Sequence, residues 1–314
     1  MITAFSILLF RQFFLVRDRV MEERRRTTER APAGLLREQL IATAFVAHPY
    51  QWPVLGWMSD IRTIKRSEVV EFWRIHYAPN NCTMVLVGDI YPEKAVPMVQ
   101  RYFGKIPSQP PPEPVKTVEP VQPGERTVRI ECNAEPLLYV GYHKPAIHHP
   151  DQYVFDVIEA LLSLGRDSRL YKRLILGKRP AARAEAHGGP DKYPGLFIFV
   201  LAPRRPHTTA DVLAALDEEI DRLLNEPVND VELQEAKDRL RTDFLQRLQT
   251  NEGLATEISF YEGLLSWDYI NTLAERREAV TASDVRRVVK KYFIRSNRTV
   301  AELVSCENKS DGSL

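Results

Sequence analysis

The stretch IKRSEV, Ile64–Val69, returns as VTASDV, Val280–Val285, 216 positions later (Ile64 to Val280). The match continues without a gap: NCT at Asn81–Thr83 lies opposite NRT at Asn297–Thr299, and Tyr77 lies opposite a phenylalanine. Each copy predicts a helix that Ser67 or its counterpart Ser283 caps, followed by a β-strand. A repeat of this length indicates two copies of one α+β domain.

Hydrophobic spacing around the first copy predicts further elements. We expect helices over 16–29, with Val16, Val20 and Met21 on the inner side, over 33–46 and over Pro92–Phe103, and a strand at Cys82–Gly88. Around the second copy we expect strands at Thr127–Cys132, Leu137–His143, 182–189, 195–203 and Asn297–Val304, and helices from Asp151 and over 208–226, 229–249, 252–265 and 269–279.

A proline-rich segment separates the two copies. Seven prolines lie between Pro107 and Pro123, a density that neither a helix nor a central strand tolerates. The sequence therefore predicts an N-terminal domain at 1–106, an extended linker at 107–124, a C-terminal domain at 125–305 and a tail at 306–314. Only 66 residues precede Ser67, about ninety fewer than the second copy has before Ser283, so we expect the first domain to be incomplete.

Composition excludes several classes of protein. The 314 residues carry 43 basic and 42 acidic side chains, so no net field attracts nucleic acid or anionic lipid. The three cysteines are far apart, which argues against a disulfide framework or a cysteine zinc site. The apolar start, Met1–Val16, is too short and interrupted to span a bilayer and lacks the features of a good signal peptide.

Five stretches of the chain resemble the M16 family of zinc metallopeptidases, the pitrilysin, insulinase and mitochondrial processing peptidase group. They are VMEERRRTTERAP (20–32), AHPYQWPVLGW (47–57), YAPNNCTMVLVGDI (77–90), RYFGKIP (101–107) and HPDQYVFDVIEALLSLGRDSRLYKRL (149–174). The resemblance covers about 16–305 in the family's order and is closest to the bacterial single-chain type. It implies an α+β fold made of two homologous α/β-sandwich (metallopeptidase M16/LuxS-like) domains, here with the first incomplete.

The resemblance also implies a chemistry. Members hold a catalytic zinc with two histidines of an H-x-x-E-H helix and with a glutamate on a later helix, and the glutamate of the motif is the general base. The substrate is a peptide or an unfolded protein segment, which pairs with a sheet edge. The resemblance therefore implies peptide hydrolysis by a metal-activated water.

Carried onto this sequence, the later glutamate falls on Glu23, the metal-ligand position. Three departures follow. The family usually has a second, supporting glutamate at the position that is Val16 here. Many members also have an arginine and a tyrosine seven residues apart that steady the substrate, but here no tyrosine lies seven residues after an arginine. None of the seven histidines begins H-x-x-E-H; they are His48, His76, His143, His148, His149, His187 and His207. A lone carboxylate supplies a small part of the roughly 10–16 kcal/mol of a complete structural site, so we expect no zinc bound by this chain alone.

Other residues favour ordinary structural roles. Arg24–Arg26 beside Glu22 predicts an exposed, salt-bridged helix face. His143, His148 and His149 lack metal-ligand spacing and are expected in loops, and Gly165 lacks the rest of a phosphate loop. We expect the four tryptophans to be core or interface anchors; they are Trp52, Trp57, Trp73 and Trp267.

Three hypotheses for function remain open at this stage. The chain is a fragment or subunit of a zinc endopeptidase that is inactive without an H-x-x-E-H-bearing partner. Alternatively, it is a non-catalytic peptide-binding or structural subunit of the same fold that complements an active partner, or a truncated product without function. The sequence leaves open the peptide specificity, the oligomeric state, whether 1–15 belong to the fold, and a compartment that is either bacterial periplasm or cytoplasm.

Overall fold

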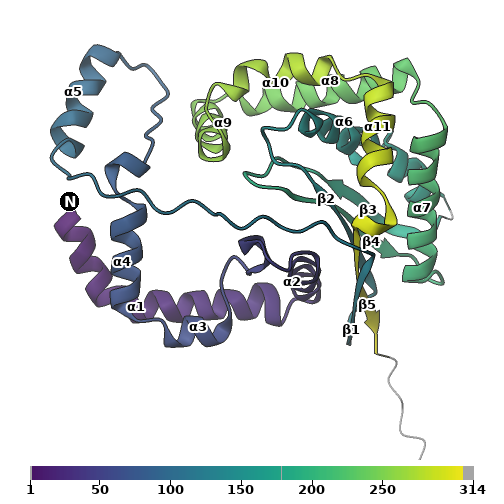
Figure 1. Cartoon of the computed structure of the whole chain (residues 1–314), viewed down its shortest axis with the longest axis horizontal. Helices are drawn as coiled ribbons and strands as arrows, with labels where there is room; N and C mark the ends of the chain where they lie inside the picture. The colour runs from purple at the N-terminus through teal and green to yellow at the C-terminus, as the bar shows by residue number, and fades with distance from the viewer. Residues whose placement is uncertain (1, 178, 307–314) are drawn as a thin grey trace, which may run out of the picture. The chain divides into compact units, whose positions relative to one another are not determined.

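The computed structural model describes residues 2–177 and 179–306 (Figure 1). The chain forms two compact units. The N-terminal unit contains residues 1–35 and 52–117, and the C-terminal unit contains residues 36–51 and 118–314. No helix in the described part of the chain is both long and apolar enough to cross a bilayer.

The N-terminal unit is helical. Its helices are α1 (Ile2–Arg24), the start of α2 (Pro32–Ala44), α3 (Met58–Thr63), α4 (Arg66–His76) and α5 (Pro92–Phe103), with a π-helical turn at Arg25–Glu29. The strand expected at Cys82–Gly88 is wrong, because these residues form no ladder in the described structure. A strand exists only by pairing, and the described residues of this unit supply no partner strand.

The C-terminal unit is built on one mixed sheet with the strand order β1-β5-β2-β4-β3. The five strands match the expected ones closely: β1 (Arg126–Cys132), β2 (Leu137–Lys144), β3 (Ala181–His187), β4 (Gly195–Pro203) and β5 (Arg298–Ser305). Only β1 and β5 run parallel. The last strand of the chain therefore fills the place between β1 and β2.

Helices cover one face of this sheet (Figure 1). They are α6 (Asp151–Ser163), α7 (Thr209–Asn225), α8 (Asp230–Arg247), α9 (Asn251–Leu264), α10 (Tyr269–Glu278) and α11 (Ala282–Tyr292). Alternate residues of the central strands point to opposite faces, so Phe197 and Phe199 join the large core under the helices. On the other face, Leu36 and Leu40 of α2 pack against Val200 and its neighbours. The fold is the expected α+β arrangement.

The structure supports the internal repeat. Helices α4 and α11 each contain 11 residues and lie 216 positions apart (Arg66 to Ala282). The Asn81 side-chain amide donates to the His76 carbonyl at 2.8 Å, and its counterpart Asn297 donates to the Tyr292 carbonyl at the same distance. The two copies thus end their helices by the same local device.

The helix caps differ from the prediction. The N-cap residues are Lys65 and Thr281, not Ser67 and Ser283, and each helix begins two residues earlier than a serine cap would allow. The Thr281 hydroxyl accepts from the Asp284 amide, and the Asp284 carboxylate accepts from the Thr281 amide at 3.1 Å. This reciprocal arrangement satisfies two backbone groups at once, which a cap at Ser283 would leave open.

Candidate functional site

Glu23, the expected metal-ligand position, lies in the last turn of α1, and its side chain is exposed. Its backbone carbonyl accepts from the Thr27 hydroxyl at 2.7 Å. The neighbouring Arg24 is buried, not exposed as expected, and its guanidinium lies 5.3 Å from the centre of the Trp57 ring. Packing of Arg24 against α3 therefore fixes this turn and directs Glu23 outward.

The side chains around Glu23 do not form a zinc site. Glu22, the adjacent acid, is engaged in ion pairs with Arg25 at 3.2 Å and Arg30 at 3.3 Å, as the expected salt-bridged face requires. Within residues 2–177 and 179–306, no group of three or more His, Cys, Asp or Glu side chains is placed to hold a metal ion. A zinc ion needs three or four such donors, so the donor set here does not fit zinc. Val16, at the supporting position, is exposed rather than on an inner face.

The N-terminal unit carries an apolar groove of about 1050 Å³ instead. It runs between α4 and α5 and includes the extended segment that follows α4. Its lining residues are Val69, Phe72, Trp73, Tyr77, Pro79, Cys82, Thr83, Met84, Val85, Val99, Gln100, Phe103, Gly104 and Ile106, and none of these described residues is charged. We call this surface the α4–α5 groove. An uncharged, aromatic concave surface of this size is typical of protein contacts.

The linker is anchored to the C-terminal unit by one carboxylate. Glu119 accepts the backbone amides of Val46 and Ala47 at 2.9 Å and of His48 at 2.8 Å. Burial raises the pKa of Glu119, but the three amide donors outweigh it and hold that pKa below its ordinary value. This contact fixes the turn after α2 to the proline-rich chain.

Of the three clustered histidines, His143 lies in β2 and not in a loop. Its Nε2 lies 3.1 Å from the Ala44 carbonyl at the end of α2, and burial lowers its pKa. His148 and His149 lie in the turn before α6, as expected. His143 therefore caps a helix and is not set up as a metal ligand.

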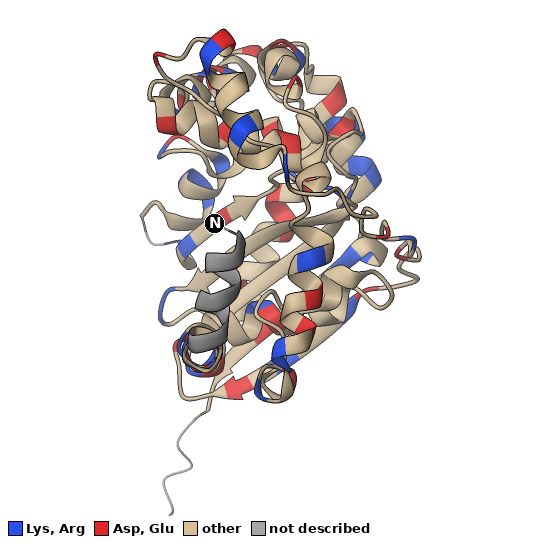
Figure 2. Ribbon diagram, turned by 90° about the vertical axis from the view of Figure 1, so that its left-hand side faces the viewer, with Lys and Arg blue, Asp and Glu red and all other residues tan. Residues whose placement is uncertain are grey.

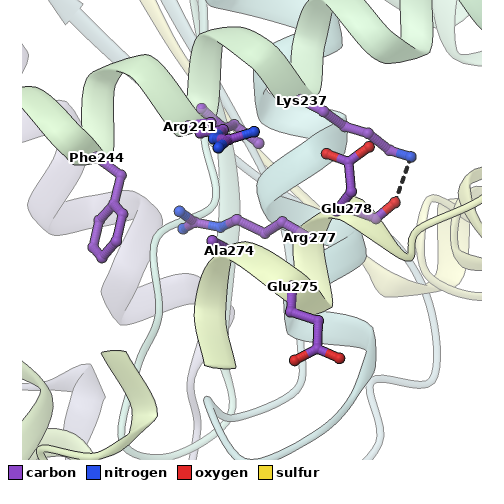
Figure 3. Close-up of a pocket in the computed structure, with 8 residues that line it drawn as sticks. Lys237, Arg241, Phe244, Ala274, Glu275, Arg277 and Glu278 are labelled. Carbon is purple, nitrogen blue, oxygen red and sulfur yellow. Dashed lines mark hydrogen bonds between the residues drawn. The ribbon is translucent and has the colours of Figure 1, made fainter. Parts of the chain in front are cut away.

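The cavity between α8 and α10 in the C-terminal unit has a volume of about 250 Å³ (Figure 3). Two of the charged side chains that line it, Lys237 and Arg277, have partners. The Lys237 ammonium donates to the Glu278 carbonyl at 2.6 Å, and Arg277 pairs with Asp156 of α6 at 2.6 Å. These groups join helices of one core, so the cavity offers no unpaired catalytic cation at these two positions.

A second cavity, of about 380 Å³, lies along α6 and contains Glu159. The Glu159 carboxylate accepts the Gly188 amide at 2.7 Å, and burial raises its pKa despite that bond. Glu159 thus closes the loop after β3. The sequence does not predict this role of Glu159, because nothing in a helical glutamate's neighbours indicates which distant backbone amide it will bind.

Two of the four tryptophans lie outside the core. Trp52 and Trp267 are largely exposed, whereas Trp57 and Trp73 are partly buried. Positive and negative side chains are interspersed along the described ribbon without segregation by sign (Figure 2). Among the described residues, this mixing of charges does not favour a nucleic-acid interface.

Known proteins match this chain over most of its length. The sequence profile described as the peptidase M16 inactive domain matches residues 63–240. The chain belongs to the M16 peptidase family. The zinc protease PqqE of Helicobacter pylori is 30% identical over 293 residues, which are 90% of this chain and 64% of the relative. A probable mitochondrial-processing peptidase subunit beta of Arabidopsis thaliana is 25% identical over 82% of this chain and 50% of its own length.

Solved structures of M16 proteins agree with this assignment. The crystal structure of a protease from Helicobacter pylori has a TM-score of 0.88 and 26% identity, and the match covers 93% of this chain and 72% of that chain. The M16 inactive domain from Pseudomonas fluorescens has a TM-score of 0.82 at 17% identity, which supports the fold alone. The chain spans less than two thirds of the length of the two curated relatives described above.

Proposed function

We propose that this chain is the non-catalytic part of an M16-type zinc endopeptidase that acts on peptides or unfolded protein segments, and that it cleaves no peptide by itself. One observation carries the proposal: the sequence has no H-x-x-E-H, and the one carried-over ligand, Glu23, is exposed on α1 with no set of metal donors around it among the described residues. The name of the Helicobacter pylori relative, a zinc protease, supports zinc in the family.

A peptide substrate requires a strand edge, and the C-terminal unit offers two. Strands β1 and β3 are the outer strands of the sheet and each pairs with one neighbour. Edge backbone groups accept an added strand with little dependence on sequence, which suits unfolded segments. On this proposal the chain holds substrate, and metal-activated water is supplied on another segment.

The purified 314-residue chain tests the proposal. We expect no cleavage of a fluorogenic peptide library with or without added zinc chloride, and less than stoichiometric zinc by mass spectrometry after dialysis. Glu23→Gln should leave the zinc content unchanged. One tightly bound zinc per chain, together with cleavage that a chelator abolishes and zinc restores, would overturn the proposal.

The α4–α5 groove favours a second candidate, a structural subunit that complements an active partner and does not itself hold peptide. Fluorescence anisotropy of a labelled unfolded peptide separates the two. A saturable rise on titration with the chain supports the substrate-holding role. An unchanged anisotropy, with cleavage gained only when a partner is added, supports the structural one.

A further inference from the structure

We propose that the cavity of about 380 Å³ along α6 binds a small organic cation, a primary ammonium group on a short aliphatic chain. We call this hollow the α6 cavity. It lies within the C-terminal unit, and residues of α6, α8, α9 and α10 and of the loop after β3 line it. The inference goes beyond the proposed function and does not depend on it.

The charged side chains of the α6 cavity do not balance. Its lining carries four carboxylates and two guanidinium groups, which give a net charge of −2 when all are ionised. Arg277 pairs with Asp156 at 2.6 Å. Arg247 is shared by two acids, Asp243 and Glu257, each at 2.8 Å. The two guanidinium groups therefore leave a negative excess in the cavity, and that excess favours a cationic ligand.

Glu159 is a carboxylate that the two guanidinium groups leave without an ion pair among the described residues. Its Oε2 accepts the Gly188 amide at 2.7 Å, and its Oε1 accepts no hydrogen bond from any residue that the structure describes. Burial raises the pKa of Glu159 even though the Gly188 amide acts to lower it, as expected of a carboxylate without a bound cation. An ammonium group at Oε1 would supply the missing charge.

A second polar group of the α6 cavity is also open. Tyr261 of α9 lines the cavity and is only 3% exposed, yet its hydroxyl has no hydrogen-bond partner among the described residues. The charged groups that act on its pKa all line the cavity and so place the hydroxyl at the cavity wall; they are Arg277, Asp156, Glu257 and Arg247. Burial raises the pKa of Tyr261 to about 12, so the hydroxyl is neutral at pH 7 and can accept from an ammonium group. Buried polar groups are normally paired, so an open one points to a ligand.

The open acceptors favour an ammonium group over other cations. A guanidinium binds best to both oxygens of one carboxylate, but Oε2 of Glu159 already accepts the Gly188 amide. A metal ion needs several ligands close together, and among the residues with described positions no three acids, histidines or cysteines are so placed. An ammonium group is a compact charge with three donors, and it needs only one oxygen from each acceptor.

The rest of the lining suits a short aliphatic chain. Leu164, Leu240 and Phe260 are apolar parts of the wall. The rings of Phe260 and Tyr261 also attract a cation that lies over their faces. The volume of about 380 Å³ is near the lower end of small-molecule sites, which span about 300–1,000 Å³, so the ligand is small.

Binding of butylamine to the purified chain tests the inference. We expect saturable binding in a saturation-transfer NMR titration at pH 7, where the amine is protonated. The uncharged analogue 1-butanol should bind at least about tenfold more weakly, because it cannot form a charged hydrogen bond. No saturable binding of butylamine, or equal binding of 1-butanol, would overturn the proposal.

Two variants locate the binding. Glu159→Gln keeps an oxygen for the Gly188 amide but removes the charge, and it should raise the Kd for butylamine at least about tenfold. Tyr261→Phe should raise the Kd about fivefold without lowering the urea midpoint, because it removes a hydroxyl that no described residue binds. The matched control is Glu135→Gln, outside the cavity, where the carboxylate pairs with Arg205 at 3.1 Å; it should leave the Kd unchanged.

Circular dichroism checks that each variant folds. An unchanged Kd in both Glu159→Gln and Tyr261→Phe would place the amine elsewhere and overturn the proposal.

Nα-acetyl-lysine amide identifies the source of the ammonium group. Tighter binding than butylamine assigns the cavity to a lysine side chain of a peptide, and weaker binding assigns it to a free amine; both support an ammonium site. The proposed function is tested separately by cleavage and zinc content. Loss of amine binding would leave those results unchanged, and peptide cleavage by the chain alone would leave the ammonium site intact.

Discussion

Replacing the linker carboxylate, Glu119→Gln, should loosen the turn after α2. The carboxylate accepts three amides, from Val46 on Oε1 and from Ala47 and His48 on Oε2, at 2.8–2.9 Å. Glutamine keeps one acceptor oxygen, so at least one amide must face an NH₂ group. Hydrogen bonds to a charged group contribute about 1.5–3 kcal/mol each, and the group is half-buried, so we expect a loss of about 2 kcal/mol.

Hydrogen exchange measures this loss where it occurs. A local loss of about 2 kcal/mol makes the amides of residues 46–48 exchange about 30-fold faster at pH 7. Glu113→Gln is the matched control, because Glu113 lies in the same linker and makes only an exposed pair with Lys116 at 2.9 Å among its described contacts. That variant should leave the exchange of residues 46–48 unchanged.

The pH dependence gives an independent check of the same contact. The pKa of Glu119 is lowered in the folded chain, so its stabilisation is complete above the unfolded pKa and is lost as the pH falls through the folded one. The difference between the parent and Glu119→Gln should therefore shrink below about pH 4. An equal exchange rate in the two proteins at pH 7, or a difference that grows in acid, would refute this account of the turn.

Two further predictions concern the cores. Phe293→Ala should destabilise the C-terminal unit by about 3–5 kcal/mol, measured by urea unfolding followed by circular dichroism. The same change at its exposed counterpart, Tyr77→Ala, should change stability by about 0.5 kcal/mol. Similar losses from the two variants would contradict the difference in burial. Arg277→Ala should cost about 3–5 kcal/mol because it leaves Asp156 buried without its charge partner, and adding Asp156→Asn should recover part of that loss; a single variant as stable as the parent would show that the pair contributes nothing.

The helices and strands of the C-terminal unit could be predicted closely because each has its own periodic signal. The alternation in β1 and the helical spacing of Val154, Ile158 and Leu161 in α6 are short-range patterns that the sequence shows directly. The predicted N-cap of α11 lies two residues too late in the chain, because Thr281 and Ser283 both carry a hydroxyl that could cap a helix. Only the reciprocal contact with Asp284 distinguishes them.

The prediction of a strand at Cys82–Gly88 is wrong for a different reason. Its β-branched residues predict which faces are apolar, but pairing depends on other strands that local sequence does not specify. The same limit applies to the site. The position of Glu23 followed from the family resemblance, whereas the α4–α5 groove follows only from the fold of the N-terminal unit.

The place of β5 has a consequence for how the C-terminal unit is made. Strands β1 and β2 are neighbours in sequence but leave between them a slot that only the last strand fills. Nearly the whole unit must therefore emerge from the ribosome before its sheet can close. The entropic cost of closing the long loop between β2 and β5 is incurred only when β5 joins the sheet. Until β5 arrives, the edges of β1 and β2 that face it are open to other chains, so the growing chain is most exposed to aggregation before β5 joins the sheet.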